Sequence, residues 1–396
     1  MNVTAALTPD NTTGSTPRDA RGTTLAITGW GVVSSLAIGA DEFTAALREG
    51  RSGLRDVTGM FDEELPEDQA FAMPDFKVRD HLGRKGTSFF DRSTALGLLG
   101  CTLALDDTDL TVTDDNRDRV GIVLGTTAGS IKATSDYSRE TLENDRPYLV
   151  NPVLFPNTVM NCAAGQSAIW HKLKGVNATV AGGQLAGLST LRYARNQIRR
   201  GYADALLVGS VEEFSPHTAW FDHRQHSAEE GRARLGEGSA VFVVEDAATV
   251  RAQGRHPDAE VLAVEVGTYG APGREPDAGA GLADCIRRAL ARAGVEPSQV
   301  RAVATGESGI ARLDDIECRG TEAALGTEVW RVRAKQWVGE CHGASGSLQI
   351  AAVLAGHRSH PELDGAVSVV TSVSPDGGVG AAVLRGWHRA RGDHRG

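Results

Sequence analysis

The chain has 396 residues, of which 41% are hydrophobic and 47 are glycine, a length that favours two domains or one large duplicated domain over a single ordinary core. Its formal net charge of −10 and the lack of a basic stripe argue against nucleic acid as a partner. No stretch approaches the roughly 20 apolar residues of a membrane helix, so we expect no membrane association either. The composition is typical of an α/β globular protein with many tight turns.

Residues 1–22 are rich in Thr, Asn, Asp, Pro and Gly and lack an apolar run, which predicts a flexible leader and not a signal peptide. The five cysteines are odd in number, scattered, and without CxxC spacing. This pattern favours buried, reduced thiols in a cytoplasmic compartment. The acidic pairs also lack ligand spacing, so we expect no metal site. The cysteines are Cys101, Cys162, Cys285, Cys318 and Cys341.

The first half, residues 23–250, alternates short apolar runs with stretches of helical periodicity. After a buried strand at 119–124, a polar excursion over 125–161 is long for a loop, and such excursions usually carry a binding surface or an oligomer contact. Within it Ile131, Thr134 and Ser138 recur at the spacing of one face of a short helix. The other predicted elements are strands at 24–33, 205–208 and 240–245, and helices at 41–48, 88–105 and 185–199.

The second half, residues 251–396, repeats this plan. A glycine-rich stretch in each half, GGQLAGLSTL from Gly182 and GECHGASGSL from Gly339, suggests internal duplication. The sequence Ser374-Pro-Asp-Gly-Gly378 predicts a hairpin turn between the last two strands. The predicted elements are strands at 260–266, 301–304, 367–372 and 380–384, and helices at 282–293, 315–325 and 344–355.

The stretch Thr179–Leu188 predicts an elbow, in which a short apolar strand passes through two glycines into a helix that starts near Leu185. Such an elbow holds one residue at a helix N-terminus, where backbone N–H groups point outward and favour an anionic nucleophile. The residue at the apex is Gln184. An amide cannot attack a thioester at neutral pH, so the elbow has the geometry of an active site without its nucleophile.

Three long segments resemble the β-ketoacyl synthases of the thiolase superfamily. They are ITGWGVVSSLAIGADEFTAALREGRSGL over 27–54, NPVLFPNTVMNCAAGQSAI over 151–169 and LGEGSAVFVVED over 235–246. The resemblance covers nearly the whole chain from about residue 24 onward. It implies an α/β fold of five layers, αβαβα, built from two similar halves, with dimerisation through the first half.

Active members of this family carry a cysteine at the elbow and two histidines in the second half. The cysteine aligns with Gln184, the first histidine with Thr305 and the second with Glu340. His342 lies two residues after Glu340, so a shifted register remains an alternative. The Phe-bearing gating turn of the active enzymes is replaced by Ser374-Pro-Asp. These departures resemble the chain-length factors, or ketosynthase beta subunits, of bacterial type II polyketide synthases.

The resemblance to chain-length factors implies no cofactor and two kinds of partner. One is an active ketosynthase that forms a heterodimer with this chain, and the other is an acyl carrier protein that presents a malonyl-derived polyketone, in the biosynthesis of antibiotic-like metabolites. The tunnel-narrowing positions of chain-length factors align with Ile131, Thr134 and Ser138, of which two are small. Phe155 and Pro156 are candidates for the partner interface, with core packing as the alternative. The resemblance also implies that Glu317 and Lys335 form a pair near the site, and we expect this pair to have a structural role here.

Two other functions remain open from the residues alone. A loading synthase with glutamine at the elbow decarboxylates malonyl units, but it keeps both histidines, and a negative charge on Glu340 would repel the enolate. A scaffold paralogue without a tunnel would have a filled cavity beside the elbow. We expect the Gln184 amide to satisfy the elbow N–H groups, Cys341 to be buried and unreactive, and His342 to be a turn residue.

Overall fold

One continuous mixed sheet of ten strands runs through the molecule and joins its two halves where β1 pairs with β8. The computed structural model describes residues 23–225, 230–269 and 278–388, so the leader predicted over 1–22 lies outside the described residues. The strand order is β10-β9-β11-β12-β8-β1-β7-β6-β4-β5, which places five strands of each half on either side of the junction. This repeat is the duplicated architecture expected from the sequence.

The strands of the first half are β1 (Leu25–Ser34), β4 (Val120–Thr126), β5 (Asn177–Ala181), β6 (Ala205–Glu212) and β7 (Gly238–Asp246). Those of the second half are β8 (Ala259–Thr268), β9 (Val300–Ala304), β10 (Trp330–Val332), β11 (Val367–Val373) and β12 (Gly378–Gly386). A small separate hairpin pairs β2 (Arg55–Asp56) with β3 (Gln69–Ala70).

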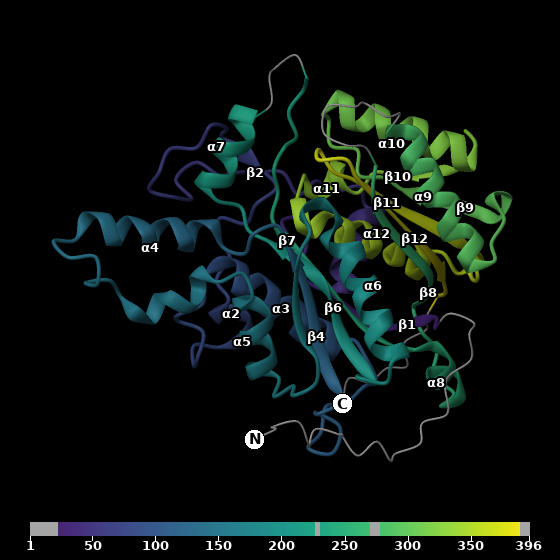
Figure 1. Cartoon of the computed structure of the whole chain (residues 1–396), viewed down its shortest axis with the longest axis horizontal. Coiled ribbons are helices and arrows are strands. Elements are labelled where there is room, and N and C mark those ends of the chain that lie inside the picture. Colours follow the sequence, from purple (N-terminus) through teal and green to yellow (C-terminus); the bar gives the residue numbers. More distant parts are fainter. Residues whose placement is uncertain (1–22, 226–229, 270–277, 389–396) are drawn as a thin grey trace, which may run out of the picture.

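The helices form three layers around this sheet (Figure 1). α6 (Ala186–Arg199) and α12 (Ser345–Ser359) contact each other and strands of both halves, so they form the middle layer. α3 (Arg92–Asp106) and α5 (Cys162–Trp170) cover the outer side of the first half, and α9 (Ala278–Ala293) and α10 (Ala311–Leu325) cover the second. With the two halves of the sheet as two strand layers, these three helix layers make up the five-layered α/β fold predicted from the resemblance, which is therefore confirmed. The remaining helices are α1 (Ala40–Arg48), α2 (Arg79–Leu82), α4 (Ile131–Glu143), α7 (Pro216–Gln225), α8 (Ala247–Ala252) and α11 (Lys335–Val338).

Most predicted elements are present, with shifts at their ends. The long helix predicted from residue 88 begins at Arg92 instead, because Asp91 caps it by accepting a hydrogen bond from the Thr94 N–H. The turn predicted at 374–378 connects β11 to β12, which pair in antiparallel register. The sequence did not predict α7, α8 or β10, which are short and lack a clear apolar period.

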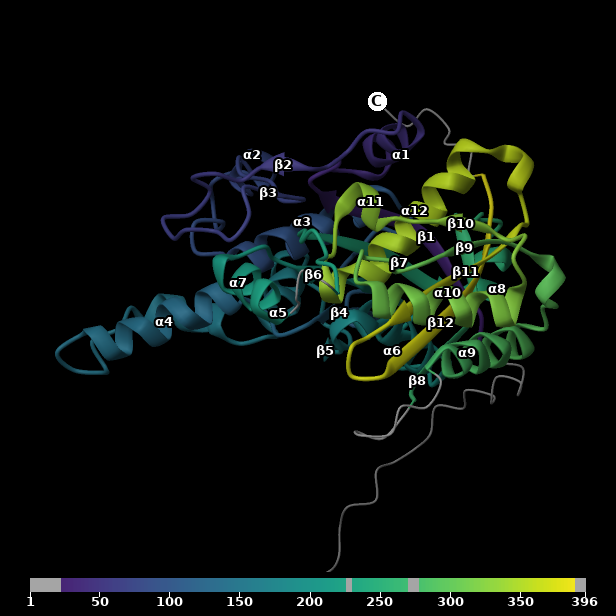
Figure 2. The ribbon, with the colours of Figure 1, turned by 90° about the horizontal axis from the view of Figure 1, so that it is seen from above.

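The polar excursion contains α4, which projects from the body of the molecule (Figures 1 and 2). The Ser130 side chain caps this helix by accepting a hydrogen bond from the Ala133 N–H. No residue of α4 is buried, so the fold of this chain gives it no core to pack into. After α4 the chain returns through a 3₁₀ segment, Pro152–Thr158, which packs against the helix.

The described part of the chain includes all five cysteines, and every one of them is free. Four are buried and Cys318 is half-buried, as expected for reduced thiols. Among the described residues, no helix has the length and apolar character needed to cross a membrane.

Candidate functional site

The predicted elbow is present at the carboxyl end of β5. Gln184 lies in a single 3₁₀ turn, Gly183–Leu185, immediately before α6. Gly183 adopts a positive φ of 49°, a left-handed conformation that glycine adopts without a steric penalty. The second glycine-rich stretch forms the matching 3₁₀ turn His342–Ala344 before α12, and the two turns contact each other. The two halves therefore bring their elbows together.

Gln184 faces a cavity of about 240 Å³ between the two elbows. Its backbone carbonyl accepts a hydrogen bond of 2.8 Å from the Ser372 hydroxyl. Its side-chain amide forms no hydrogen bond within the described part of the chain, so the expectation that it would satisfy the elbow N–H groups is wrong. The Leu185 N–H instead bonds to the Gly182 carbonyl, and the amide is left to face the cavity.

Glu340, which aligns with a catalytic histidine, is buried on one wall of this cavity. One carboxylate oxygen pairs with the Lys335 ammonium at 2.5 Å, and the other accepts hydrogen bonds of 2.8 Å from the Ser345 hydroxyl and the His342 N–H. Burial raises the pKa of Glu340, but the charges of Lys335 and His342 and the hydrogen bonds from Lys335 and Ser345 together more than offset that effect, so the pKa lies below its ordinary value. The carboxylate is therefore charged but neutralised by Lys335, which weakens the repulsion of an enolate predicted from the sequence.

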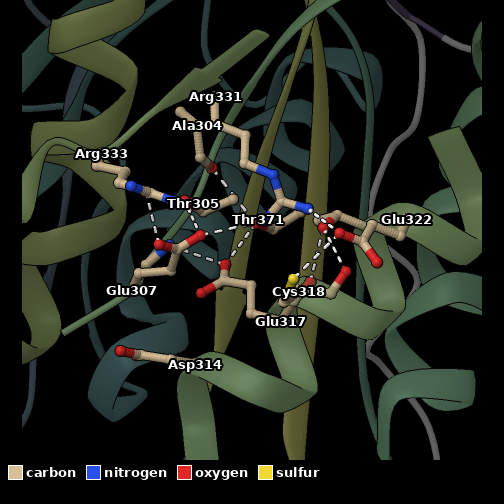
Figure 3. A network of polar contacts seen from close by, with 12 residues as sticks. Ala304, Thr305, Glu307, Asp314, Glu317, Cys318, Glu322, Arg331, Arg333 and Thr371 are labelled. Carbon is tan, nitrogen blue, oxygen red and sulfur yellow. Dashed lines mark hydrogen bonds and ion pairs between the residues drawn. The ribbon is translucent and has the colours of Figure 1, made fainter. Parts of the chain in front are cut away.

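Thr305, which aligns with the other histidine, is completely buried and turned toward the protein (Figure 3). Its hydroxyl donates to the Glu307 carboxylate at 3.3 Å. Glu307 also pairs with Arg331 at 3.2 Å and with Arg333 at 2.7 Å. The position that would hold an imidazole in an active synthase is thus the end of an ion-pair network, and Thr305 does not line the cavity.

Glu317 and Lys335 both contact Gly306 and line the cavity. The Gly306 N–H donates to Glu317 at 2.8 Å, and the Gly306 carbonyl accepts from Lys335 at 2.6 Å. The Thr371 hydroxyl also donates to Glu317, and burial raises the pKa of this carboxyl above its ordinary value. The predicted pair therefore meets through one backbone unit, while the ion-pair partner of Lys335 is Glu340.

The thiols near the site do not supply a substitute nucleophile. Cys341 is completely buried, its Sγ donates to the Val338 carbonyl at 3.3 Å, and burial raises its pKa well above the ordinary value. Burial also raises the pKa of Cys162, which lies at the start of α5. His342 lies in the 3₁₀ turn before α12 with a φ of 39° and lines the cavity, so it is a turn residue whose side chain faces the cavity.

The three predicted tunnel residues separate in the structure. Ile131, at the first position of α4, lines the Gln184 cavity. Thr134 and Ser138 lie further along the same helix, are exposed, and do not line the cavity. Their hydroxyls donate to backbone carbonyls one turn earlier, at Ser130 and Thr134. Any contact of these two side chains with a substrate therefore takes place outside the cavity of this chain.

Phe155 and Pro156 lie on the surface of the 3₁₀ segment that follows α4. The Phe155 side chain is 54% exposed and contacts the Tyr137 ring of α4 at 5.9 Å between ring centres. This exposure argues against the alternative of core packing within this chain.

Two buried carboxyl groups beside the site were not predicted from the sequence. Glu212, at the end of β6, lines the cavity and accepts hydrogen bonds from the N–H groups of Thr127 and Gly343. Glu213 follows it and contacts the N-terminus of α4. The sequence signal that could have identified them is an acidic pair at the end of an apolar strand. Ligands bind at the carboxyl ends of strands in open α/β sheets, so acidic residues at such a position are candidates for a site.

Two family models match this chain in succession. The β-ketoacyl synthase N-terminal domain matches residues 23–254, and the β-ketoacyl synthase C-terminal domain matches residues 259–358. Among curated relatives, the actinorhodin polyketide β-ketoacyl synthase 2 of Streptomyces coelicolor is 29% identical over 350 residues, which cover 84% of this chain and 85% of that protein.

Solved structures show the same likeness. The ishigamide ketosynthase/chain length factor is similar to this chain with a TM-score of 0.80 and 36% identity, covering 92% of this chain and 100% of that chain. A type II polyketide ketosynthase, solved with its acyl carrier protein and bound to a hexaketide, shares the fold at a TM-score of 0.74, with 19% identity and coverage of 92% and 99%. With both family models matched in order and the elbow in place, this chain belongs to the β-ketoacyl synthase family.

Proposed function

We propose that this chain is a non-condensing chain-length factor, which pairs with an active ketosynthase and shapes the tunnel in which the polyketide chain grows. The observation that carries the proposal is Gln184 at the apex of an intact elbow, beside an open cavity. Condensation requires a thiolate that holds the acyl chain as a thioester, and an amide cannot form that bond. The family architecture is retained while its nucleophile is absent.

The groups that stabilise an enolate in active synthases are also replaced. Thr305 donates its hydroxyl to Glu307, and Glu340 is held by Lys335 and Ser345. Neither position offers a preorganised donor aimed at a substrate oxygen, which this chemistry requires. We therefore assign the cysteine and both histidines of the reaction to the partner subunit.

The first half carries two features that support association with a second subunit. Large exposed apolar side chains concentrate between residues 142 and 169, from the end of α4 through the 3₁₀ segment to α5 and in the connections between them. The 3₁₀ segment contacts both helices. β5 is the last strand of the sheet and pairs only with β4 in the described part of the chain, which leaves its other edge open to a partner strand. Exposed apolar side chains and a free strand edge support association with a second subunit. The apolar residues are Leu142, Tyr148, Leu149, Val153, Phe155, Val159, Met160 and Ile169.

We assign the second subunit to an active ketosynthase and the substrate to a chain carried by an acyl carrier protein. The first assignment is supported by the 36% identity to the ishigamide ketosynthase/chain length factor. The second is supported by the ketosynthase of the same fold that was solved with its carrier protein and a bound hexaketide.

The proposal is tested by coexpression of this chain with candidate ketosynthases and assay of malonyl consumption and product by the pair and by each subunit. We expect product only from the pair. Gln184→Ala in this chain should leave the rate of malonyl consumption close to that of the unsubstituted pair, whereas replacement of the partner's elbow cysteine by alanine should abolish product, because only the thiol forms the thioester. Loss of all product from the Gln184→Ala pair, with the pair still assembled, would contradict a non-catalytic role.

The free Gln184 amide favours one second candidate function. It faces the cavity without a protein partner among the described residues, and Lys335 neutralises Glu340 beside it. A malonyl decarboxylase that supplies a starter unit would use such an amide. Release of carbon dioxide from malonyl carrier protein by the isolated chain, lost in Gln184→Ala, would establish this function. The scaffold alternative predicted a filled cavity, whereas a volume of about 240 Å³ is open.

Ser138→Phe is expected to shorten the polyketide made by the pair. Ser138 is exposed on the face of α4 that begins with Ile131, so a phenyl ring there would narrow a tunnel formed against the partner. Mass spectrometry of the products would measure the change. Glu143→Phe is the matched control, since Glu143 is exposed at the end of α4 but lies off that face by helical periodicity. Unchanged products from Ser138→Phe would remove Ser138 from the tunnel.

A further inference from the structure

The Gln184 cavity has a neighbour along the adjacent face of α7. A groove of about 720 Å³ lies between α7 and Glu63, and its α7 lining includes Pro216, Trp220 and Phe221. Phe221 and Gln225 line both the groove and the Gln184 cavity. The two spaces therefore adjoin along α7, and these two side chains lie at the boundary between them.

Phe221 is a large apolar side chain that the core does not use. It is 67% exposed, although Pro216, Ala219 and Asp222 of the same helix are buried. An exposed phenyl ring is free to change rotamer without disturbing the packing of α7 against the body. Phe221 lines both spaces and can change rotamer, so its ring can open or close the passage between them.

The groove offers apolar surface to a ligand. The Trp220 indole N–H is already bonded to the Glu64 carbonyl at 2.9 Å. The Arg224 guanidinium lies over the Trp220 ring at 5.3 Å from its centre, so its charge is directed at the ring. Arg224 covers one face of the Trp220 ring, so a carbon chain that enters the groove would meet the Phe221 ring and the apolar parts of Pro216 and Trp220.

The volumes of the Gln184 cavity and the groove indicate the kind of ligand that would occupy both. Binding sites for small molecules occupy roughly 300–1,000 Å³, and the Gln184 cavity is smaller than this range at about 240 Å³. The groove lies within the range at about 720 Å³. A growing chain that reaches the cavity past Ile131, which lines the cavity from α4, would fill it and then need a second space.

We propose that the groove beside α7 holds the far end of acyl chains that outgrow the Gln184 cavity, and that Phe221 sets the length at which a chain passes between them. This inference rests on the proposed function as a chain-length factor and adds Phe221 to the residues that determine product length. The occupant is the acyl chain built at the partner's cysteine. Its atoms are only bound and shielded here, and no bond is formed or broken in this chain.

The test uses the assembled pair with an acyl carrier protein and malonyl donor. We expect Phe221→Ala to lengthen the products and Phe221→Trp to shorten them, each by at least one two-carbon unit. Even one methylene of mismatch in an apolar site changes discrimination by roughly tenfold or more. Gln225→Phe places a ring at the other shared position and should also shorten the products. Trp330→Ala is the matched control, because Trp330 is 61% exposed on β10 at the opposite end of the sheet from β5.

Coelution of each variant with its partner shows that assembly is intact before products are compared. Products shifted by the Phe221 and Gln225 variants, but not by Trp330→Ala, support the inference. If Ser138→Phe shortens the products while all three variants at Phe221 and Gln225 leave them unchanged, the groove is not part of the tunnel, although the chain-length function stands. If no variant of this chain changes product length, the chain-length function and the inference both fail.

Discussion

Arg358→Ala is expected to destabilise the fold by about 3–5 kcal/mol, because it removes one partner from a buried network of ion pairs. Arg358 lies in the last turn of α12, and its guanidinium pairs with Asp258 at 2.8 Å and with Asp107 at 2.6 Å. Both carboxylates are almost completely buried. The variant would therefore leave two carboxylates without their main counter-charge.

The position of Arg358 explains why the effect should be global. Asp107 caps the end of α3 in the first half, whereas Asp258 precedes β8 in the second half. The guanidinium also lies over the Trp30 ring at 4.6 Å from its centre, a contact that adds cation–π attraction. One side chain thus ties together both halves and the middle helix layer.

Urea unfolding of the wild type and variant, followed by circular dichroism, would measure the loss. Arg358→Lys should recover little of it, since an ammonium cannot contact both carboxylates with the planar geometry of a guanidinium. Arg51→Ala is the control, because Arg51 pairs with Glu42 at the surface, and exposed pairs contribute about 0–1 kcal/mol. If Arg358→Ala costs no more than Arg51→Ala, the network does not hold the halves together.

Local pattern was sufficient to predict most of the sheet and the elbow. The strands around Ile27 and Leu207 are continuous apolar runs, and the elbow at Gln184 has glycines at the positions where the backbone turns. These features depend on neighbours within a few residues, so they can be recognised in a single sequence. The alignment of Gln184 and Glu340 also placed both of them at one cavity.

The side-chain partners could not be predicted in the same way. Arg358 and Asp107 are separated by 251 positions, and no periodicity connects them. The family resemblance predicted that Lys335 would meet Glu317, but the ion pair that Lys335 forms is with Glu340, which the resemblance places at a histidine position. The hydrogen bond from Thr305 to Glu307 was not predicted either, because it depends on how the loop after β9 folds. When a residue at a catalytic position is replaced, the residues around it form different hydrogen bonds and ion pairs. An alignment does not show these changes.

In the wild type, we expect the free energy of unfolding to decrease as the pH rises from about 4.5 to about 8, because of Glu213. Glu213→Gln is expected to abolish this decrease. Glu213 is buried, its carboxylate accepts hydrogen bonds of 3.0 Å from the Ser130 hydroxyl and 3.1 Å from the Lys132 N–H, and it thereby holds the N-terminus of α4. Burial, followed by the charge of Asp91, raises its pKa from 4.5 to about 8. Glu212 also faces it, as does Arg92 from α3.

The sign follows from which state binds the proton. Between the unfolded pKa of 4.5 and the folded pKa of about 8, the folded chain keeps a proton that the unfolded chain has lost. Stability is therefore complete below about pH 4.5 and decreases as the pH rises toward 8. At about 1.4 kcal/mol per pKa unit, the free energy of unfolding decreases by an amount on the order of a few kcal/mol. The group responsible contacts the first turn of α4.

Glutamine keeps an acceptor for the Lys132 N–H and cannot ionise, so Glu213→Gln should gain stability relative to the wild type as the pH increases. Urea unfolding midpoints from pH 5 to pH 9 would show two curves that diverge toward high pH. Glu143→Gln removes an exposed carboxylate at the other end of α4 and should run parallel to the wild type. If the Glu213→Gln curve is also parallel, this carboxyl does not titrate with folding. If the curves diverge, pairing with a second subunit through α4 should weaken in the wild type over the same pH interval, because Glu213 is one of the side chains that anchor the first turn of the helix that carries Ile131.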